Sequence, residues 1–439
     1  MTRRPTRFRM VAALLLLVGC SPAMHAQTTF HGNATRTGVF AGTGPAQTPT
    51  VQWRFATAGP IVTTPAVVDG VVYVASLSGH LYAIDAATGR ERWNFKSRMP
   101  IASSPTVADG VVYFVSSAGS LAAIDAATGQ PKWVYAVEHE RRFEKPGLHG
   151  YGPAAQTIPD AWDMFVSSPA VVDGRVHFGS GDGNVYAVGT DGVLQWKFAT
   201  GDVVHGSPAV ANGVVYVGSY DGRVYALDAA SGQQKWSFQG GLDPALHNQQ
   251  GFQASPAVAD GVVYIGSRDA HVYALDAVTG RKKWDYPTSK SWVNTTPAVR
   301  DGLVYAATSD SSRFFALDAR TGRLRFNFDA RAYVFSSPAL AGPLAYFGAH
   351  NGHLYAVEAT TGKLAWEFAT ESARADAQGL LDPEGRLDRD GFKPVFGDFQ
   401  DMYLDFARFV SLGAFFGSPT VANGVLYVGS TDGHLYALR

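Results

Sequence analysis

Short runs of alternating apolar and polar residues, rich in Val and Tyr, recur along most of the 439-residue chain. A period of two is typical of β-strands that bury one face. Between the runs stand pairs such as Asp221-Gly222, Asn351-Gly352 and Asp432-Gly433, whose residue types tolerate the positive φ angles of two-residue hairpin turns. The pattern therefore predicts antiparallel strands joined by tight turns.

These strands belong to a repeated unit that reads S-P-A-V, D-G-V-V-Y-V-G-S, D-G-x-V-Y-A-L-D-A-x-T-G and W-x-F, with four strands per unit. The marker prolines of the eight copies are Pro65, Pro105, Pro169, Pro208, Pro256, Pro297, Pro338 and Pro419. Eight four-stranded sheets leave edges exposed unless they pack radially and close into a ring. We therefore predict an all-β fold, an eight-bladed β-propeller of four-stranded antiparallel blades.

Both ends of the chain are predicted to contribute to one blade. In most units 28 residues separate the marker proline from the outer-strand Trp, as between Pro65 and Trp93, but only 20 residues follow Pro419. The last unit therefore lacks its outermost strand, while residues 51–55 form an unpaired outer strand before the first unit. We predict that this N-terminal strand completes the last blade and closes the ring.

One phrase, A-x-D-x-x-T-G-x-x-x-W, recurs at residues 83–93, 123–133, 226–236 (with Ser231 in place of Thr) and 274–284. Its repetition predicts a structural role: the Trp packs between adjacent blades, and the Asp and Thr satisfy backbone groups of the turn. The phrase resembles the tryptophan-docking repeat of propellers of the pyrroloquinoline quinone (PQQ) type. That superfamily includes quinoprotein alcohol dehydrogenases and BamB-like lipoproteins of outer-membrane protein assembly.

The resemblance covers residues 51–439, and it implies the fold more firmly than a function. His31-Gly32-Asn33 and Arg36-Thr37-Gly38 also resemble the segment that precedes the first blade in many relatives. The predicted organisation is a signal at residues 1–26, a leader at 27–50, and a single propeller at 51–439. Three connections between blades are unusually long, at about residues 136–163, 240–251 and 369–413.

The long connections should crowd one face of the propeller, because each joins an outer strand to the next inner strand. Long irregular segments on a rigid scaffold are usually functional, so this face is the predicted binding surface. Within the third connection, residues 398–412 place apolar side chains at helical spacing and predict a short amphipathic helix. Such a helix either covers the propeller or presents an aromatic surface to a partner.

The N-terminus predicts export. Arg3, Arg4, Arg7 and Arg9 precede an apolar run at residues 11–18 that is too short to span a bilayer. The run is followed by Gly19 and Cys20, the only cysteine, in a context that resembles the lipobox of bacterial lipoproteins. We expect a periplasmic protein anchored to the outer membrane through lipidated Cys20, or alternatively a soluble exported protein cleaved after Ala26.

Net charge excludes one class of partner: 36 basic and 37 acidic residues give no broad attraction to nucleic acid. The residue three positions before each marker proline should lie near the mouth of the channel. His205, Gln253 and Asn294 are the polar residues there, and with Trp292 they are the candidate ligand-binding residues. The alternative is that they bind channel water. No metal spacing is evident.

Two functions remain open. The resemblance to dehydrogenases implies PQQ, a calcium ion held by Glu and Asn, an Asp base and a vicinal disulfide, which a single cysteine cannot form. Residues 291–294 offer no carboxylate at the position comparable to the Trp-Asp pair of such enzymes. We therefore expect no catalytic residues and no cofactor, and a monomeric BamB-like scaffold for protein partners of the barrel-assembly machinery. A PQQ-dependent alcohol dehydrogenase, or a propeller that binds a small molecule or polysaccharide, is the alternative.

Overall fold

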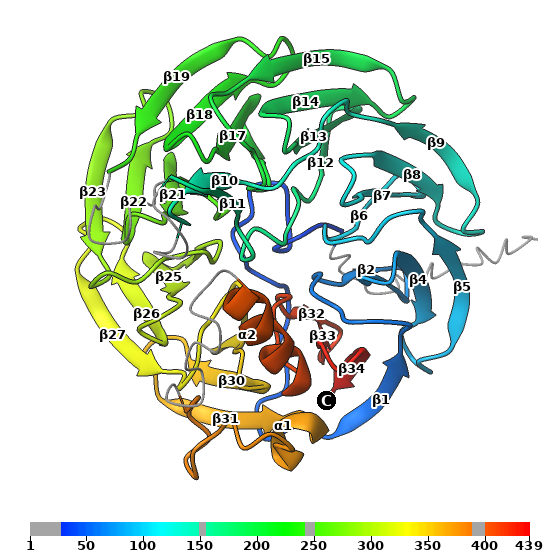
Figure 1. Ribbon diagram of the computed structural model, residues 1–439, viewed down its shortest axis with the longest axis vertical. Coiled ribbons are helices and arrows are strands. Elements are labelled where there is room, and N and C mark those ends of the chain that lie inside the picture. Colours follow the sequence, from blue (N-terminus) through cyan, green and yellow to red (C-terminus); the bar gives the residue numbers. More distant parts are fainter. Residues whose placement is uncertain (1–27, 149–154, 242–250, 389–399) are drawn as a thin grey trace, which may run out of the picture.

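In the computed structural model, eight four-stranded antiparallel sheets are arranged radially in a ring (Figure 1). The structure describes residues 28–148, 155–241, 251–388 and 400–439, with the side chains of the last segment described from Leu404 onward. The prediction of an eight-bladed propeller is confirmed. Within the described residues, neither helix has the length and apolar character needed to cross a membrane.

Each blade is given from its innermost to its outermost strand. Blade 1 consists of β2 (Ala66–Val68), β3 (Val71–Ala75), β4 (His80–Asp85) and β5 (Glu91–Lys96). Blade 2 consists of β6 (Thr106–Ala108), β7 (Val111–Val115), β8 (Leu121–Asp125) and β9 (Pro131–Tyr135). Blade 3 consists of β12 (Ala170–Val172), β13 (Arg175–Gly179), β14 (Asn184–Gly189) and β15 (Leu194–Ala199). Blade 4 consists of β16 (Ala209–Ala211), β17 (Val214–Gly218), β18 (Arg223–Asp228) and β19 (Gln234–Gln239).

The second half of the ring continues in the same order. Blade 5 consists of β20 (Ala257–Ala259), β21 (Val262–Gly266), β22 (His271–Asp276) and β23 (Lys282–Pro287). Blade 6 consists of β24 (Ala298–Arg300), β25 (Leu303–Ala307), β26 (Arg313–Asp318) and β27 (Leu324–Asp329). Blade 7 consists of β28 (Ala339–Ala341), β29 (Leu344–Gly348), β30 (His353–Glu358) and β31 (Leu364–Ala369). Blade 8 consists of β32 (Thr420–Ala422), β33 (Val425–Gly429), β34 (His434–Leu438) and β1 (Val51–Ala56).

The long connections contain the remaining elements. The first forms a small hairpin of β10 (Glu144–Pro146) and β11 (Thr157–Pro159), and the third contains α1 (Glu371–Ala375) and α2 (Gln400–Ser411). The predicted amphipathic helix is thus confirmed as α2, although residues 398 and 399 lie outside the described range. Most of the second connection also lies outside it.

Burial follows the position of a strand in its blade. β3 is buried along its whole length, because neighbouring blades cover both faces of a middle strand, and its sequence Val-Val-Tyr-Val-Ala is continuously apolar. β5, an outermost strand, alternates between exposed and half-buried residues. The alternation that predicts strands is therefore clearest at the rim of the ring.

Ring closure occurs as predicted, since β1 pairs antiparallel with β34 and places Phe55 opposite Leu435. The leader also supplies a contact at the junction of blades 7 and 8. At other junctions the outer-strand Trp donates its indole N–H to a carbonyl in the turn between the third and fourth strands of the next blade, as Trp53 does to Ala86 at 2.9 Å. Trp366 instead donates to the carbonyl oxygen of Pro45 in the leader, also at 2.9 Å.

The predicted inter-blade role of the Trp side chains is confirmed by their contacts. Trp93 donates to the Ala126 carbonyl at 3.0 Å, and Asp125 accepts the backbone N–H and the hydroxyl of Thr128. Glycine is required in this turn: Gly89 has φ +70°, and a Cβ there would lie 2.7 Å from Trp53. The Asp-x-x-Thr-Gly phrase therefore shapes a platform for the indole of the preceding blade.

The predicted two-residue turns at Asp221-Gly222, Asn351-Gly352 and Asp432-Gly433 are wrong. Only the glycines have positive φ there, and Ser219 pairs with Arg223 across a three-residue loop. The Asp221 carboxylate fixes this longer loop because it accepts the Arg223 N–H and the Tyr225 hydroxyl. Two-residue turns with both residues at positive φ lie instead between the first and second strands, as at Asp69-Gly70.

Deletion of residues 51–55 should destabilise the whole ring, because β34 would become an unpaired edge and the contacts of Trp53 with Tyr427 and of Phe55 with Tyr82 would be lost. We expect the free energy of unfolding to fall by at least about 3–5 kcal/mol, the typical loss for one large buried aromatic residue. Thermal melting measures the effect, with exposed Gln52→Ala as the control. An unchanged melting temperature of the deletion variant would refute closure by this strand.

Candidate functional site

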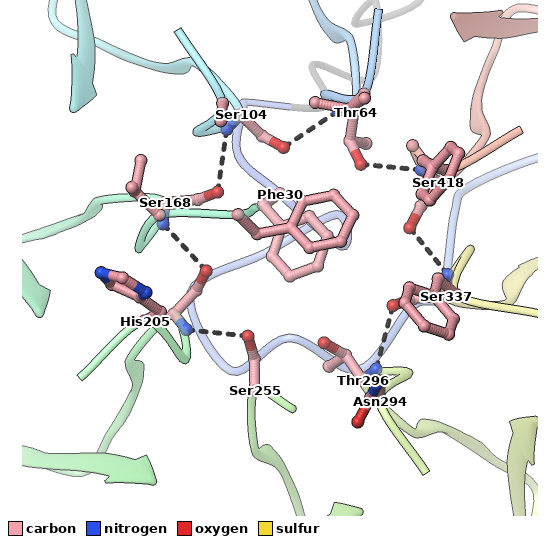
Figure 2. Close-up of a pocket in the computed structure, with 18 of the residues that line it drawn as sticks. Phe30, Thr64, Ser104, Ser168, His205, Ser255, Asn294, Thr296, Ser337 and Ser418 are labelled. Carbon is pink, nitrogen blue, oxygen red and sulfur yellow. Dashed lines mark hydrogen bonds between the residues drawn. The ribbon is translucent and has the colours of Figure 1, made fainter. Parts of the chain in front are cut away.

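The channel is held at a fixed width by a ring of hydrogen bonds between neighbouring blades. The residue before each marker proline is Ser or Thr, and at seven of the eight junctions its backbone N–H donates to the corresponding hydroxyl of the next blade, at 2.8–3.0 Å. Ser418 donates to Thr64 and so joins blade 8 to blade 1. Figure 2 shows this hydroxyl ring as a circle of dashed lines around Phe30.

A small cavity of about 60 Å³ lies on this ring. It is lined by the hydroxyl ring, by Phe30 of the leader, and by all eight residues that stand three positions before the marker prolines: Val62, Ala102, Val166, His205, Gln253, Asn294, Phe335 and Phe416. The predicted placement of His205, Gln253 and Asn294 at the mouth is thus confirmed. A cavity of this size holds a few water molecules, since one water requires about 10–15 Å³.

The leader occupies the channel on the other side of the hydroxyl ring, because it binds the innermost strands two residues after the marker prolines; Figure 1 shows its blue trace crossing the centre of the ring. Backbone N–H groups from the innermost strands of five blades donate to its carbonyl oxygens at 2.7–2.8 Å, from Val107 to Leu340. The guanidinium of Arg36 is completely buried and donates to the carbonyls of Pro208, Phe30 and Ser168. The chain therefore closes this end of the channel with its own N-terminal segment.

At the mouth, His205 is bound by the first insertion. Its Nδ1 lies 2.7 Å from the Asp163 carboxylate and its Nε2 lies 2.8 Å from Glu140, and all three side chains are almost fully buried. Burial opposes the charged imidazole, but the carboxylates of Asp163 and Glu140 outweigh it and raise the pKa of His205 to about 10. The imidazolium therefore joins both ends of the insertion to blade 4.

The two carboxylates are themselves fully engaged. Asp163 accepts the Tyr220 hydroxyl at 2.9 Å and the Phe143 N–H at 2.6 Å. Glu140 accepts the Ser180 hydroxyl at 2.7 Å and the Gly181 N–H at 2.8 Å. They lie on opposite nitrogens of the imidazole and do not converge on a common point, and within the described residues no trio of His, Cys, Asp or Glu is placed to hold a metal ion.

Gln253 forms a second attachment of the same insertion. Its amide donates to the Trp162 carbonyl at 2.8 Å, and its oxygen accepts from two guanidinium nitrogens of Arg268, at 3.0 and 2.6 Å. Arg268 is completely buried and forms an ion pair with Asp160 of the insertion. A buried Arg is stable when a carboxylate and acceptors surround it in this way.

The remaining two predicted residues take different places. Trp292 stacks on Arg268, with the guanidinium carbon 4.4 Å from the indole centroid, so it supports the same attachment. Asn294 lines the cavity, and neither polar atom of its buried amide has a hydrogen-bond partner within the described residues. A ligand-binding role for the four residues stays a prediction.

The third insertion is attached by aromatic packing. His350 is completely buried, and burial lowers its pKa to about 3, so the imidazole is neutral. Its ring centroid lies 5.1 Å from that of Phe409 in α2 and 4.0 Å from that of Phe416. Trp162 lies 5.9 Å from Phe409, which brings the described parts of the first and third insertions together over the channel.

Sequence reasoning missed Tyr220, Arg268 and His350, which contact the insertions beside the mouth. They occupy one variable position in an otherwise repeated turn, between Ser (or Ala) and Asp (or Asn). A comparison of the eight copies at that position would have found them. The acidic partners Glu140, Asp160 and Asp163 lie in a segment without a repeat, and no pattern distinguishes them.

Comparison with known proteins identifies the family. The sequence model described as outer membrane protein assembly factor BamB matches residues 45–158, 152–253 and 245–392, which together cover most of the chain. In a solved structure, BamB from Moraxella catarrhalis is 18% identical with a TM-score of 0.65, covering 89% of this chain and 99% of that one. A europium-containing methanol dehydrogenase is 14% identical with a TM-score of 0.66, covering 94% and 98%. These likenesses show the fold.

Curated relatives match only short stretches of the repeat. The serine/threonine-protein kinase AfsK of Streptomyces griseus is 39% identical over 22% of this chain and 12% of its own length. The quinoprotein alcohol dehydrogenase PedH of Pseudomonas putida is 37% identical over 16% of this chain and 13% of its own length. The chain therefore spans about an eighth of the length of these relatives.

The mouth does not fit PQQ, a tricyclic quinone with three carboxylates. The cavity of about 60 Å³ is far below the roughly 300–1,000 Å³ of typical organic-ligand pockets. Its nearest cations, His205 and Arg268, already pair with carboxylates of the insertion. A bound quinone would have to displace the first insertion, and with it most of the buried ion pairs described above.

His205→Gln should loosen the first insertion, because Glu140 and Asp163 would stay buried without their shared cation. We expect a loss of about 3–5 kcal/mol, the usual effect of breaking a buried ion pair. The contribution also depends on pH. Since the pKa of His205 is raised to about 10, its stabilisation is complete below about pH 6.5 and is lost as the pH rises through 10.

Urea unfolding of the wild type and the variant between pH 6 and pH 10.5 measures both effects, and hydrogen exchange at residues 140–148 locates them. The stability difference should shrink as the pH rises. Exposed His139→Gln is the matched control and should behave as the wild type. A difference that is independent of pH would contradict the assigned charge.

Proposed function

Because the chain belongs to the family of the outer membrane protein assembly factor BamB, we propose that it is a non-catalytic scaffold for protein partners in outer-membrane protein assembly. The single observation that carries the proposal is the occupation of the channel mouth by the first insertion, with His205, Gln253 and Arg268 bound to its side chains and backbone. Those polar groups bind the protein's own first insertion. Partners would therefore bind the outer surface of the same face.

A PQQ-dependent alcohol dehydrogenase is the second candidate, and the short matches to quinoprotein enzymes such as PedH favour it. The lack of room at the mouth speaks against it, since the reacting quinone would need the space that residues 160–165 occupy. The two candidates differ in a direct test, because only a dehydrogenase oxidises alcohol when supplied with PQQ and calcium.

The scaffold should recover subunits of the barrel-assembly machinery from solubilised outer membranes. Leu404 on α2 is an exposed apolar residue of the insertion face, so Leu404→Asp should lower recovery several-fold. Val278 is 82% exposed in a turn on the opposite face, and Val278→Asp is the matched control that should leave recovery unchanged. Quantitative mass spectrometry of the captured proteins gives the readout.

In parallel, titration with PQQ and calcium is followed by quinone absorbance and dye-linked alcohol oxidation. We expect neither saturable binding nor turnover. Saturable binding with turnover, together with failure to recover assembly subunits, would replace the scaffold with the dehydrogenase. Failure of both assays would favour a propeller that binds a small molecule or polysaccharide.

We also propose that the protein is exported to the periplasm and tethered to the outer membrane through lipidated Cys20, which lies outside the described residues. Only seven residues separate Cys20 from Thr28, whose carbonyl already accepts the Val107 N–H inside the channel. Seven extended residues reach about 25 Å. A lipid on Cys20 would therefore hold the propeller close to the membrane surface.

Cys20→Ala should abolish incorporation of labelled palmitate and move the protein from the membrane to the soluble periplasmic fraction. Ser21→Ala, next to the lipidation position, is the matched control and should keep both properties. N-terminal sequencing distinguishes the alternative, because cleavage after Ala26 would leave Gln27 as the first residue. A soluble wild-type protein that begins at Gln27 would contradict lipidation.

A further inference from the structure

Neighbouring blades share a second repeated contact, near the rim of the insertion face. An aromatic residue of the outermost strand packs against an aromatic residue of the third strand in the next blade, with ring centroids 5.2–5.9 Å apart. Seven of the eight junctions have this pair: Phe55–Tyr82, Tyr135–Tyr186, Phe198–Tyr225, Phe238–Tyr273, Tyr286–Phe315, Phe328–Tyr355 and Phe368–Tyr436.

The junction between blades 1 and 2 lacks the pair. Phe95 is present on β5, but the position of the third-strand aromatic in β8 is Ala122. The usual partner of the tyrosine is missing as well. In four other blades the tyrosine hydroxyl donates to an Asp four residues earlier, as Tyr225 does to Asp221 at 2.6 Å, and in blade 2 that position is Ala118.

The two alanines leave a groove of about 620 Å³ at this junction. Its walls are mostly apolar, and they include Phe95, Met99, Phe114 and Val134 together with the two alanines. Met99 and Val134 are 44% and 59% exposed, which is unusual for large apolar side chains. Met99 belongs to an outer-to-inner connection, so the groove opens on the same face as the insertions.

The charged residues that line the groove are all basic. Lys96 and Arg98 are its charged lining residues, and no Asp or Glu is among those that line it. Lys96 donates to the Ser78 carbonyl, whereas Arg98 is exposed and makes no ion pair within the described residues. An apolar groove with a cationic border suits an aromatic group that carries negative charge beside it.

We propose that the groove between blades 1 and 2 docks an aromatic side chain, Tyr or Phe, from an acidic segment of a protein partner. The other seven junctions identify an aromatic ring as the side chain that fits this position. The partner's acidic residues pair with Arg98 and Lys96 and stand where the turn Asp is missing. The proposal rests on the proposed function as a scaffold and names the chemistry of one partner contact.

A fluorescently labelled seven-residue peptide, with a central tyrosine between aspartates, is the probe for the full-length protein. Its binding is followed by fluorescence anisotropy. The peptide should bind the wild type saturably, and a peptide with alanine in place of the tyrosine should bind at least tenfold more weakly. Ala122→Tyr fills the groove with the protein's own ring, so it should reduce affinity at least tenfold.

A melting measurement on Ala122→Tyr and two further variants, Arg98→Glu and Arg320→Glu, keep the test independent of folding. Ala122→Tyr should melt at or above the temperature of the wild type, because it restores the repeated aromatic pair with Phe95. Arg98→Glu changes only an exposed side chain and should weaken binding several-fold. Arg320→Glu, an exposed cation of a turn on the opposite face, is the matched control and should bind as the wild type.

Equal binding of the tyrosine peptide to the wild type and to Ala122→Tyr would overturn the proposal, as would equal binding of the alanine peptide. Its failure is distinguishable from failure of the scaffold function. If the wild type and Ala122→Tyr recover barrel-assembly subunits equally, the groove proposal fails and the scaffold stands. If the wild type recovers none, the scaffold fails, and the peptide titration still decides whether the groove binds an aromatic residue.

Discussion

The hydrogen bond from a backbone N–H of one blade to the Ser or Thr hydroxyl of the next is the interaction on which the rest of the structure depends. It recurs around the channel and passes from Ser418 back to Thr64, so it joins the two ends of the chain at the centre while β1 joins them at the rim. Each bond is buried, and an unpaired N–H there would cost about 1–3 kcal/mol. The ring therefore fixes the width of the channel.

A channel of fixed, narrow width determines what its wall can do. The residues three positions before the marker prolines must point into a cavity that holds a few waters, and the leader and the first insertion close its two ends. Buried carboxylates, His205 and Arg268 then stabilise the chain's own segments. Under the proposed scaffold function, partners would therefore bind the exposed insertion face and the rim.

Departures from the repeat mark the positions that make the specific contacts of this propeller. Tyr220, Arg268 and His350 occupy a turn position that varies between copies, and each contacts an insertion. Ala118 and Ala122 are the opposite kind of departure, because they replace larger residues and open a groove. In a structure built from eight similar units, packing explains what the units share, and the differences between units carry the specific contacts.

The sequence by itself determined the eight blades, the closing strand, the packing of the Trp side chains and the positions of His205, Gln253 and Asn294 at the mouth. These features depend on local strand period and on counting between repeats, so each copy supports the others. Only the tertiary structure decided that His205 lies between Glu140 and Asp163, which are 65 and 42 residues away in the sequence. A segment without a repeat takes its conformation from long-range charge and packing, which no local pattern encodes.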